Sequence, residues 1–250
     1  MAGLGVKNKG ISDKKKMKYE SYSTIKSLPK ELLVEILAKV ASASMLDLCR
    51  VKLVCKDFLD ASEDDYVYQH ASMDKFALVP LPWFINEKES SFLKRCKDSG
   101  NSEITYREGI VEYFSSLKID SGLEKLKKAA LQGHVDSKYV YSMLLMCSQE
   151  EKERKVGFDL FCSMKTSTCV IKCRKSVKSF IRNMWVNNHV VRSNQECLCH
   201  SSTCESRERL KKLSRMSYLM IEYEDDTAFA SCQYCHVDYE LCLFCKMFET

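Results

Sequence analysis

Apolar residues recur every three or four positions along most of the chain, which is the spacing of one face of an α-helix. Between residues 27 and 62 this spacing occurs twice, first in SLPKELLVEILAKV and again after the tetrapeptide SMLD. Ser44 and Asp47 in that tetrapeptide predict a capped helix start. Residues 27–62 are therefore expected to form two or three short helices. So short a unit buries little apolar surface by itself, and we expect it to pack against something else.

A longer stretch of helical spacing runs from residue 86 to residue 185, and its most regular part is SGLEKLKKAALQGHVDSKYVYSMLLM at 121–146. Gly133 predicts the end of one helix, because glycine readily takes up the left-handed conformation that terminates helices. Ser121 and Asp136 are the expected N-caps of the helices on either side. The pattern predicts two antiparallel helices joined by a tight turn.

The segment between these stretches, residues 64–84, is rich in apolar side chains and contains Pro80 and Pro82. It predicts an irregular but packed connector. The whole chain has only three prolines and eight glycines in 250 residues, so long linkers and a turn-rich β fold are not expected. The predicted fold class is mainly α: a short helical unit, then a repeat-like helical domain, then a small cysteine-rich tail that zinc stabilises.

Positive charge is concentrated at the N-terminus, where residues 1–20 hold six lysines and two acidic residues. The chain as a whole carries a net charge of +5, so the body after this tail is nearly neutral. That balance argues against a broad nucleic-acid-binding surface. Residues 1–24 are expected to be a disordered basic tail, and the cluster KKKMK at 14–18 is also a pattern seen in nuclear import signals.

No stretch reaches the ~18 apolar residues that a membrane-spanning helix needs, and the N-terminus has no apolar core of a secretion signal. We therefore expect a protein of the nucleus, the cytoplasm or both, without a membrane partner. Its fourteen cysteines are then expected to be thiols or metal ligands rather than disulfides.

The sequence shows no glycine-rich phosphate loop and no recognisable nucleophile with a base, so no catalytic residue is predicted. A basic stripe of Arg174, Lys178 and Arg182 falls on one face of a predicted helix. We expect this face to be solvated, and contact with phosphate or an acidic partner is the alternative.

Two C-x2-C pairs close to the C-terminus predict a metal site, since a tight turn directs both thiolates of such a pair at one ion. The predicted zinc ligands are Cys232, Cys235, Cys242 and Cys245. Four thiolates leave no open position on zinc, so the ion would be structural rather than catalytic.

Two alternatives for these cysteines stay open. An upstream group could form a second site or combine with the downstream pairs in a crossed arrangement; its members are Cys197, Cys199, His200 and Cys204. The end of the chain also has apolar residues at helical spacing, namely Leu241, Phe244, Cys245 and Phe248. In that case the last stretch is a helix in which Cys245 is a small core residue.

The N-terminal helices resemble the F-box, which opens with Leu-Pro, continues with a helix of the form E-L-L-x-x-I-L and later contains Val-Cys-Lys-x-Phe. The matching residues are Leu28, Pro29, Glu31, Leu32, Leu33, Ile36, Leu37, Leu48, Arg50, Val54, Cys55, Lys56 and Phe58. The resemblance implies a domain at residues 25–70 that docks on a Skp-type adaptor. Through that adaptor it would join a cullin of a ubiquitin ligase, and the rest of the chain would present an unknown protein substrate.

The resemblance also implies which residues contact the adaptor. They are Leu28, Pro29, Leu32, Leu33, Ile36, Leu37, Leu48, Val54, Cys55 and Phe58. By this resemblance, Leu28 and Pro29 should enter the adaptor surface. How another four residues divide between the core of the F-box and its contact surface stays open at this point, namely Leu32, Ile36, Leu48 and Val54.

The helix pair at 121–146 resembles the Sel-type or tetratricopeptide repeat, through Leu126, Lys128, Ala129, Ala130 and Gly133. The second helix departs from the repeat pattern, which puts tandem repetition in doubt. We expect a helical domain at residues 71–190 and a cysteine-rich segment at 195–250. The combination looks like a plant F-box protein. Two other classes compete with it: a zinc-binding protein associated with nucleic acid or transcription, and a helical scaffold that assembles no ligase.

Overall fold

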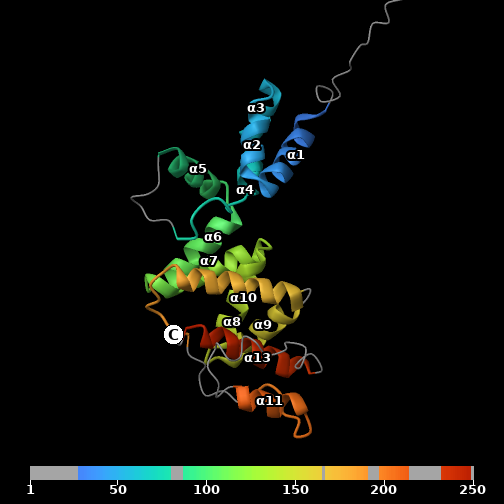
Figure 1. Ribbon diagram of the computed structural model, residues 1–250, viewed down its shortest axis with the longest axis vertical. Helices are drawn as coiled ribbons and strands as arrows, with labels where there is room; N and C mark the ends of the chain where they lie inside the picture. Colours follow the sequence, from blue (N-terminus) through green and yellow to red (C-terminus); the bar gives the residue numbers. More distant parts are fainter. Residues whose placement is uncertain (1–27, 80–86, 165–166, 191–196, 214–231, 249–250) are drawn as a thin grey trace, which may run out of the picture.

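The computed structural model describes residues 28–79, 87–164, 167–190, 197–213 and 232–248, and every element in these ranges is helical (Figure 1). The helices of the first half are α1 (Lys30–Ala43), α2 (Met45–Lys52), α3 (Lys56–Ser62), α4 (Asp65–Gln69), α5 (Glu87–Asp98), α6 (Ser102–Ile110) and the π-helical turn η3 (Val111–Ser115). Those of the second half are α7 (Ile119–Leu131), α8 (Val135–Met146), α9 (Glu151–Cys162), α10 (Ser167–Arg182), α11 (Glu205–Leu213) and α13 (Gln233–Lys246). The predicted mainly α fold is confirmed.

Some sequence predictions lie outside the described residues, namely the basic tail at 1–24 and the connector around Pro80 and Pro82. Within the described ranges, no helix combines the length and the apolar character that a membrane crossing requires.

Helices α1 to α4 enclose a hydrophobic core of their own, in which Leu37, Leu48 and Val67 are fully buried. The predicted cap of α2 is present, since the Ser44 hydroxyl accepts a hydrogen bond from the backbone N–H of Asp47 at 3.2 Å. Helix α5 contributes Cys96 to the same core. The small N-terminal unit is therefore completed by a helix that follows it in the chain.

Asn101 joins this unit to the helices that follow. Its side-chain amide donates to the backbone carbonyls of Tyr68 and Ala71, both at 3.0 Å, and its side-chain oxygen caps the start of α6. Because Asn101 is itself buried, these bonds satisfy polar groups that have no access to water.

The predicted helix pair is formed by α7 and α8, and the turn between them contains Gly133 with a φ of +90°. Helix α7 lies unusually close to the preceding turn. A Cβ atom on Gly122 would come within 2.5 Å of the backbone nitrogen of Tyr113. Only glycine permits this approach of the two backbones.

Both predicted caps of this pair are corrected by the structure. Helix α7 begins at Ile119, two residues before Ser121, and has no side-chain cap. The N-cap of α8 is His134 rather than Asp136, because the His134 ring accepts from the backbone N–H of Ser137 at 3.1 Å. A histidine is uncommon in this position, so the usual N-cap preferences pointed to the wrong residue.

Helix α13 lies between α8 and α11 and is buried on nearly all sides (Figure 1). It belongs to the larger hydrophobic core, which extends from Tyr106 to Phe248. Glu240 on α13 is fully buried and binds Arg174 through two hydrogen bonds, of 2.9 and 2.5 Å. The prediction of a solvated basic stripe is therefore wrong at Arg174, whose charge is neutralised inside the core.

Candidate functional site

The first candidate site is an apolar surface on α1, α2 and α3, which lie at the end of the molecule opposite to α11 (Figure 1). Of the thirteen exposed large hydrophobic side chains in the described part of the chain, six fall between residues 32 and 59. They are Leu32, Ile36, Leu46, Leu53, Val54 and Leu59, and together we call them the N-terminal apolar surface. So many exposed apolar side chains in one short stretch of the chain are what a protein-binding surface would supply.

The residues expected to contact an adaptor fall into two groups. Leu33, Leu37 and Leu48 are buried in the core, and Leu28 and Phe58 pack against it. In contrast, Pro29, Leu32, Ile36, Val54 and Cys55 are exposed. The buried group can only support a contact surface, whereas the exposed group is available to form one.

Three members of the surface were not among the predicted contact residues, namely Leu46, Leu53 and Leu59. Leu53 is 87% exposed and Val54 is 67% exposed, both at the turn between α2 and α3. A signal for them existed in the sequence. Each is an apolar residue that lies off the stripe facing the core. Such a residue stays exposed to solvent unless a binding partner covers it.

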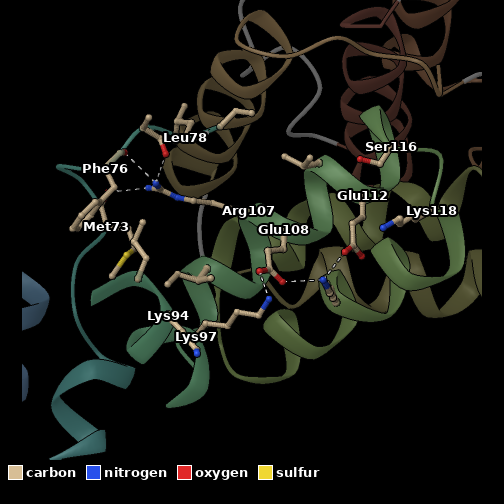
Figure 2. Close-up of a pocket in the computed structure, with 16 residues that line it drawn as sticks. Met73, Phe76, Leu78, Lys94, Lys97, Arg107, Glu108, Glu112, Ser116 and Lys118 are labelled. Atoms are coloured by element: carbon tan, nitrogen blue, oxygen red, sulfur yellow. Dashed lines mark hydrogen bonds and ion pairs between the residues drawn. The ribbon is translucent and has the colours of Figure 1, made fainter. Parts of the chain in front are cut away.

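The second candidate site is a cavity of about 510 Å³ between residues 73–79 and the helices α5, α6 and α7. Figure 2 shows Arg107 reaching across it towards the chain segment at Met73 and Phe76. The Arg107 guanidinium donates to the backbone carbonyls of Met73, Phe76 and Ala77 at 3.1 to 3.2 Å. Arg107 thus fastens this segment to α6.

The other charged groups of the cavity are largely bound to one another. Lys125 donates to Glu108 at 2.8 Å and to Glu112 at 2.6 Å, and Lys97 donates to Glu108 at 2.6 Å (Figure 2). Burial would raise the pKa of Glu108, but the bonds from Lys125 and Lys97 outweigh it and hold the pKa below its ordinary value. These groups are engaged in a structural network.

The third candidate site is a cluster of four cysteines near α11 and α13. The sulfur atoms of Cys199, Cys204, Cys232 and Cys235 all lie within 4.8 Å of one another, which is close enough for all four to hold one metal ion. A backbone hydrogen bond from Arg207 lowers the pKa of Cys204, whereas burial raises the pKa of Cys235.

This cluster corrects the predicted ligand set. Cys232 and Cys235 belong to it, but Cys242 and Cys245 do not, because α13 runs unbroken from Gln233 to Lys246. Cys235 and Cys242 are seven residues apart on one helix, which separates them by about 10 Å along its axis. Cys245 lies instead against Cys147, with 3.7 Å between the sulfurs. For the second pair, Cys242 and Cys245, the structure shows the alternative prediction: the last stretch is a helix, and Cys245 is a residue of the hydrophobic core.

The upstream group is also divided by the structure. Cys199 and Cys204 join the cluster, while Cys197 stays outside it and His200 is exposed to solvent. The crossed arrangement left open by the sequence is therefore the one that the structure forms.

Comparison with known families agrees with this architecture. The F-box-like family matches residues 25–74, and the family of plant tetratrico peptide repeats matches residues 76–182. The chain thus has the make-up of an F-box protein with a helical-repeat region.

Individual relatives show the family directly. "F-box protein At2g35280" of Arabidopsis thaliana is 30% identical over 133 residues, which cover 53% of this chain and 80% of that protein. "Putative F-box protein At1g67623" of the same plant is 28% identical over 230 residues, covering 87% of this chain and 75% of the relative. The chain belongs to the F-box proteins. No solved structure has significant similarity to it.

Proposed function

We propose that this protein is the substrate-receptor subunit of a Skp–cullin–F-box ubiquitin ligase. Its F-box binds a Skp-type adaptor, the adaptor links it to a cullin, and the helical region after the F-box recruits a target protein. The chain itself is not an enzyme in this scheme, because ubiquitin transfer takes place on other subunits. We place it in the nucleus or the cytoplasm, where the predicted partners would meet it.

The observation that carries the proposal is the N-terminal apolar surface, which lies within the F-box match at residues 25–74. Leu32 and Ile36 are one helical turn apart on α1, and each is 45% exposed. Apolar side chains in this arrangement fit a partner that supplies its own helices, as in helix-in-groove recognition. The few central apolar residues of such an interface account for most of the binding free energy.

Adaptor binding tests the proposal with the full-length chain and a purified Skp-type adaptor. We expect the double substitution Leu32→Asp and Ile36→Asp to weaken binding by about 30-fold or more, because it places two charges in an apolar interface. Isothermal titration calorimetry of the adaptor with the wild-type chain and with the double variant measures the effect.

The matched control places the same charge on other exposed apolar positions. Leu131 and Val156 lie in the helical region, and their side chains are 80% and 54% exposed. Leu131→Asp and Val156→Asp should therefore leave adaptor binding unchanged. Absence of binding by the wild-type chain would contradict the proposal and favour a scaffold that assembles no ligase. Binding of DNA or RNA that falls steeply with added salt would favour the nucleic-acid alternative.

A further inference from the structure

The four sulfurs of the cysteine cluster are arranged as the ligands of a single ion. Cys204 and Cys235 are 3.6 Å apart, and Cys199 and Cys232 are 3.8 Å apart. Four thiolates around one tetrahedral zinc ion, each at about 2.3 Å, would lie about 3.8 Å from one another. Sulfurs joined in a disulfide are much closer, at about 2.05 Å. The observed spacing matches a coordination shell rather than two disulfides.

We propose that Cys199, Cys204, Cys232 and Cys235 bind one zinc ion as a closed structural site. Two ligands come from the loop that leads into α11, since Cys204 immediately precedes Glu205. The other two come from the start of α13, where Cys232 is the N-cap and Cys235 lies in the first turn. The site does not depend on the proposed adaptor function, because it lies at the opposite end of the molecule (Figure 1).

The donor set narrows the choice of ion. Four thiolates are soft ligands, and in tetrahedral geometry they select zinc or iron. An iron–sulfur cluster would hold the thiolates farther apart, because several irons and sulfides lie between them. All four sulfurs lie within 4.8 Å of one another, so they surround a space of the size of one ion. With four protein ligands, no position is left for water or substrate, and the role is structural.

The position of the site indicates what the ion stabilises. Cys199 and Cys235 are buried, and both belong to the same hydrophobic core as α8, α10 and α13. The loop before α11 is fastened to α13 by one further bond, from the backbone N–H of Leu198 to Asp238 at 2.7 Å. Zinc would join the segment before α11 to the start of α13 and hold α13 in the core, so metal binding and folding of this region are coupled.

The chain offers its own control positions. Cys197 lies two residues before the first ligand, and Cys242 lies on the same helix as Cys235, yet neither belongs to the cluster. Substituting them tests whether metal is held by these four sulfurs or by cysteines in general.

The experiment measures zinc and iron per chain by mass spectrometry of the full-length protein, purified under reducing conditions. We expect about one zinc ion per chain in the wild type. The double variant Cys204→Ala and Cys232→Ala, with one half-buried ligand removed from each segment, should lose this zinc. The control variants Cys197→Ala and Cys242→Ala should retain it.

Cobalt substitution of the wild type keeps the proposal testable if a ligand variant fails to fold. Cobalt(II) bound to four thiolates should give intense sulfur-to-metal charge-transfer and tetrahedral d–d absorption, and zinc should displace it. Chelation of the metal should speed amide hydrogen exchange in α11 and α13 and leave α1 to α4 unchanged. A metal-free wild type, iron in place of zinc, or zinc that is lost only with Cys242 would each overturn the proposal.

Discussion

Glu240 is a carboxylate with no exposure to solvent in the middle of a largely apolar helix. It accepts hydrogen bonds from the guanidinium of Arg174 and, at 2.7 Å, from the hydroxyl of Tyr139. A buried charge without such partners is strongly destabilising. These two residues therefore stabilise the Glu240 carboxylate inside the core.

Removing the members of this buried group singly should give graded losses of stability. Glu240→Ala removes the carboxylate that binds the buried Arg174 guanidinium, and should lower the free energy of unfolding by about 3–5 kcal/mol. Tyr139→Phe removes one hydrogen bond to a charged group and should lower it by about 1.5–3 kcal/mol. Chemical denaturation followed by circular dichroism measures both effects.

The double variant Arg174→Met with Glu240→Leu provides the control, because it removes both charges together. It should be less destabilising than the sum of Arg174→Met and Glu240→Leu measured singly. Additive effects would mean that the two charges do not stabilise each other in the folded protein.

The cysteines show how far single residues could be predicted from the sequence. The C-x2-C spacing singled out Cys232 and Cys235, because two thiolates at this spacing meet at a turn, and the structure places both in the four-cysteine cluster. The partners of this pair could not be predicted, since they depend on whether the chain turns or stays helical after Cys235. Arg174 was misjudged for a similar reason: its buried partner lies 66 residues away in the sequence.

At the scale of elements, the turn between α7 and α8 combines a predicted feature with one that was not predicted. Gly133 ends α7 in the left-handed conformation, as the sequence indicates. His134 then caps α8 and also binds Glu103, with 2.6 Å between Nε2 and the carboxylate. Because its Nδ1 accepts from the backbone N–H of Ser137, the ring N–H that donates to Glu103 lies on Nε2.

Substitutions at His134 should separate these two roles. His134→Ala removes the cap and the bond to Glu103, and should lower the free energy of unfolding by about 1–2 kcal/mol. His134→Asn keeps a good N-cap but, like His134→Ala, loses the bond to Glu103 and the ring contact with Tyr106, so about 1 kcal/mol should be recovered relative to the alanine variant. Urea denaturation of the three proteins measures the difference, and equal stability of the two variants would show that the cap contributes nothing.

The helices themselves were well predicted, because their apolar spacing is local information. The α7–α8 pair and the F-box helices appear where the pattern placed them. Helix α13 is different, since its burial on all sides depends on α8, α10 and α11, which lie far away in the sequence. When a helix is buried on nearly all sides, its apolar residues do not mark one face. The spacing of residues alone then cannot distinguish such a helix from a short metal-binding segment.

For the molecule as a whole, two hydrophobic cores meet at α6. The smaller core holds α1 to α5, and Ile104 of α6 packs against it. The larger core holds the remaining helices and begins with Tyr106 and Ile110 of the same helix. A single helix thus connects the proposed adaptor-binding end to the proposed target-binding region, with Asn101 and Arg107 as additional ties.

Because each core is nearly self-contained, we expect the two to unfold as separate units in native-state hydrogen exchange. Leu37→Ala opens a cavity in the smaller core and should speed exchange in α1 to α4, by the equivalent of about 2–5 kcal/mol, with little change in α8 and α13. Phe244→Ala in the larger core should have the reverse effect, and it serves as the control for the first variant. If both variants speed exchange equally at both ends, the molecule is one cooperative unit. A local response would mean that the F-box helices keep their fold when the larger core is destabilised.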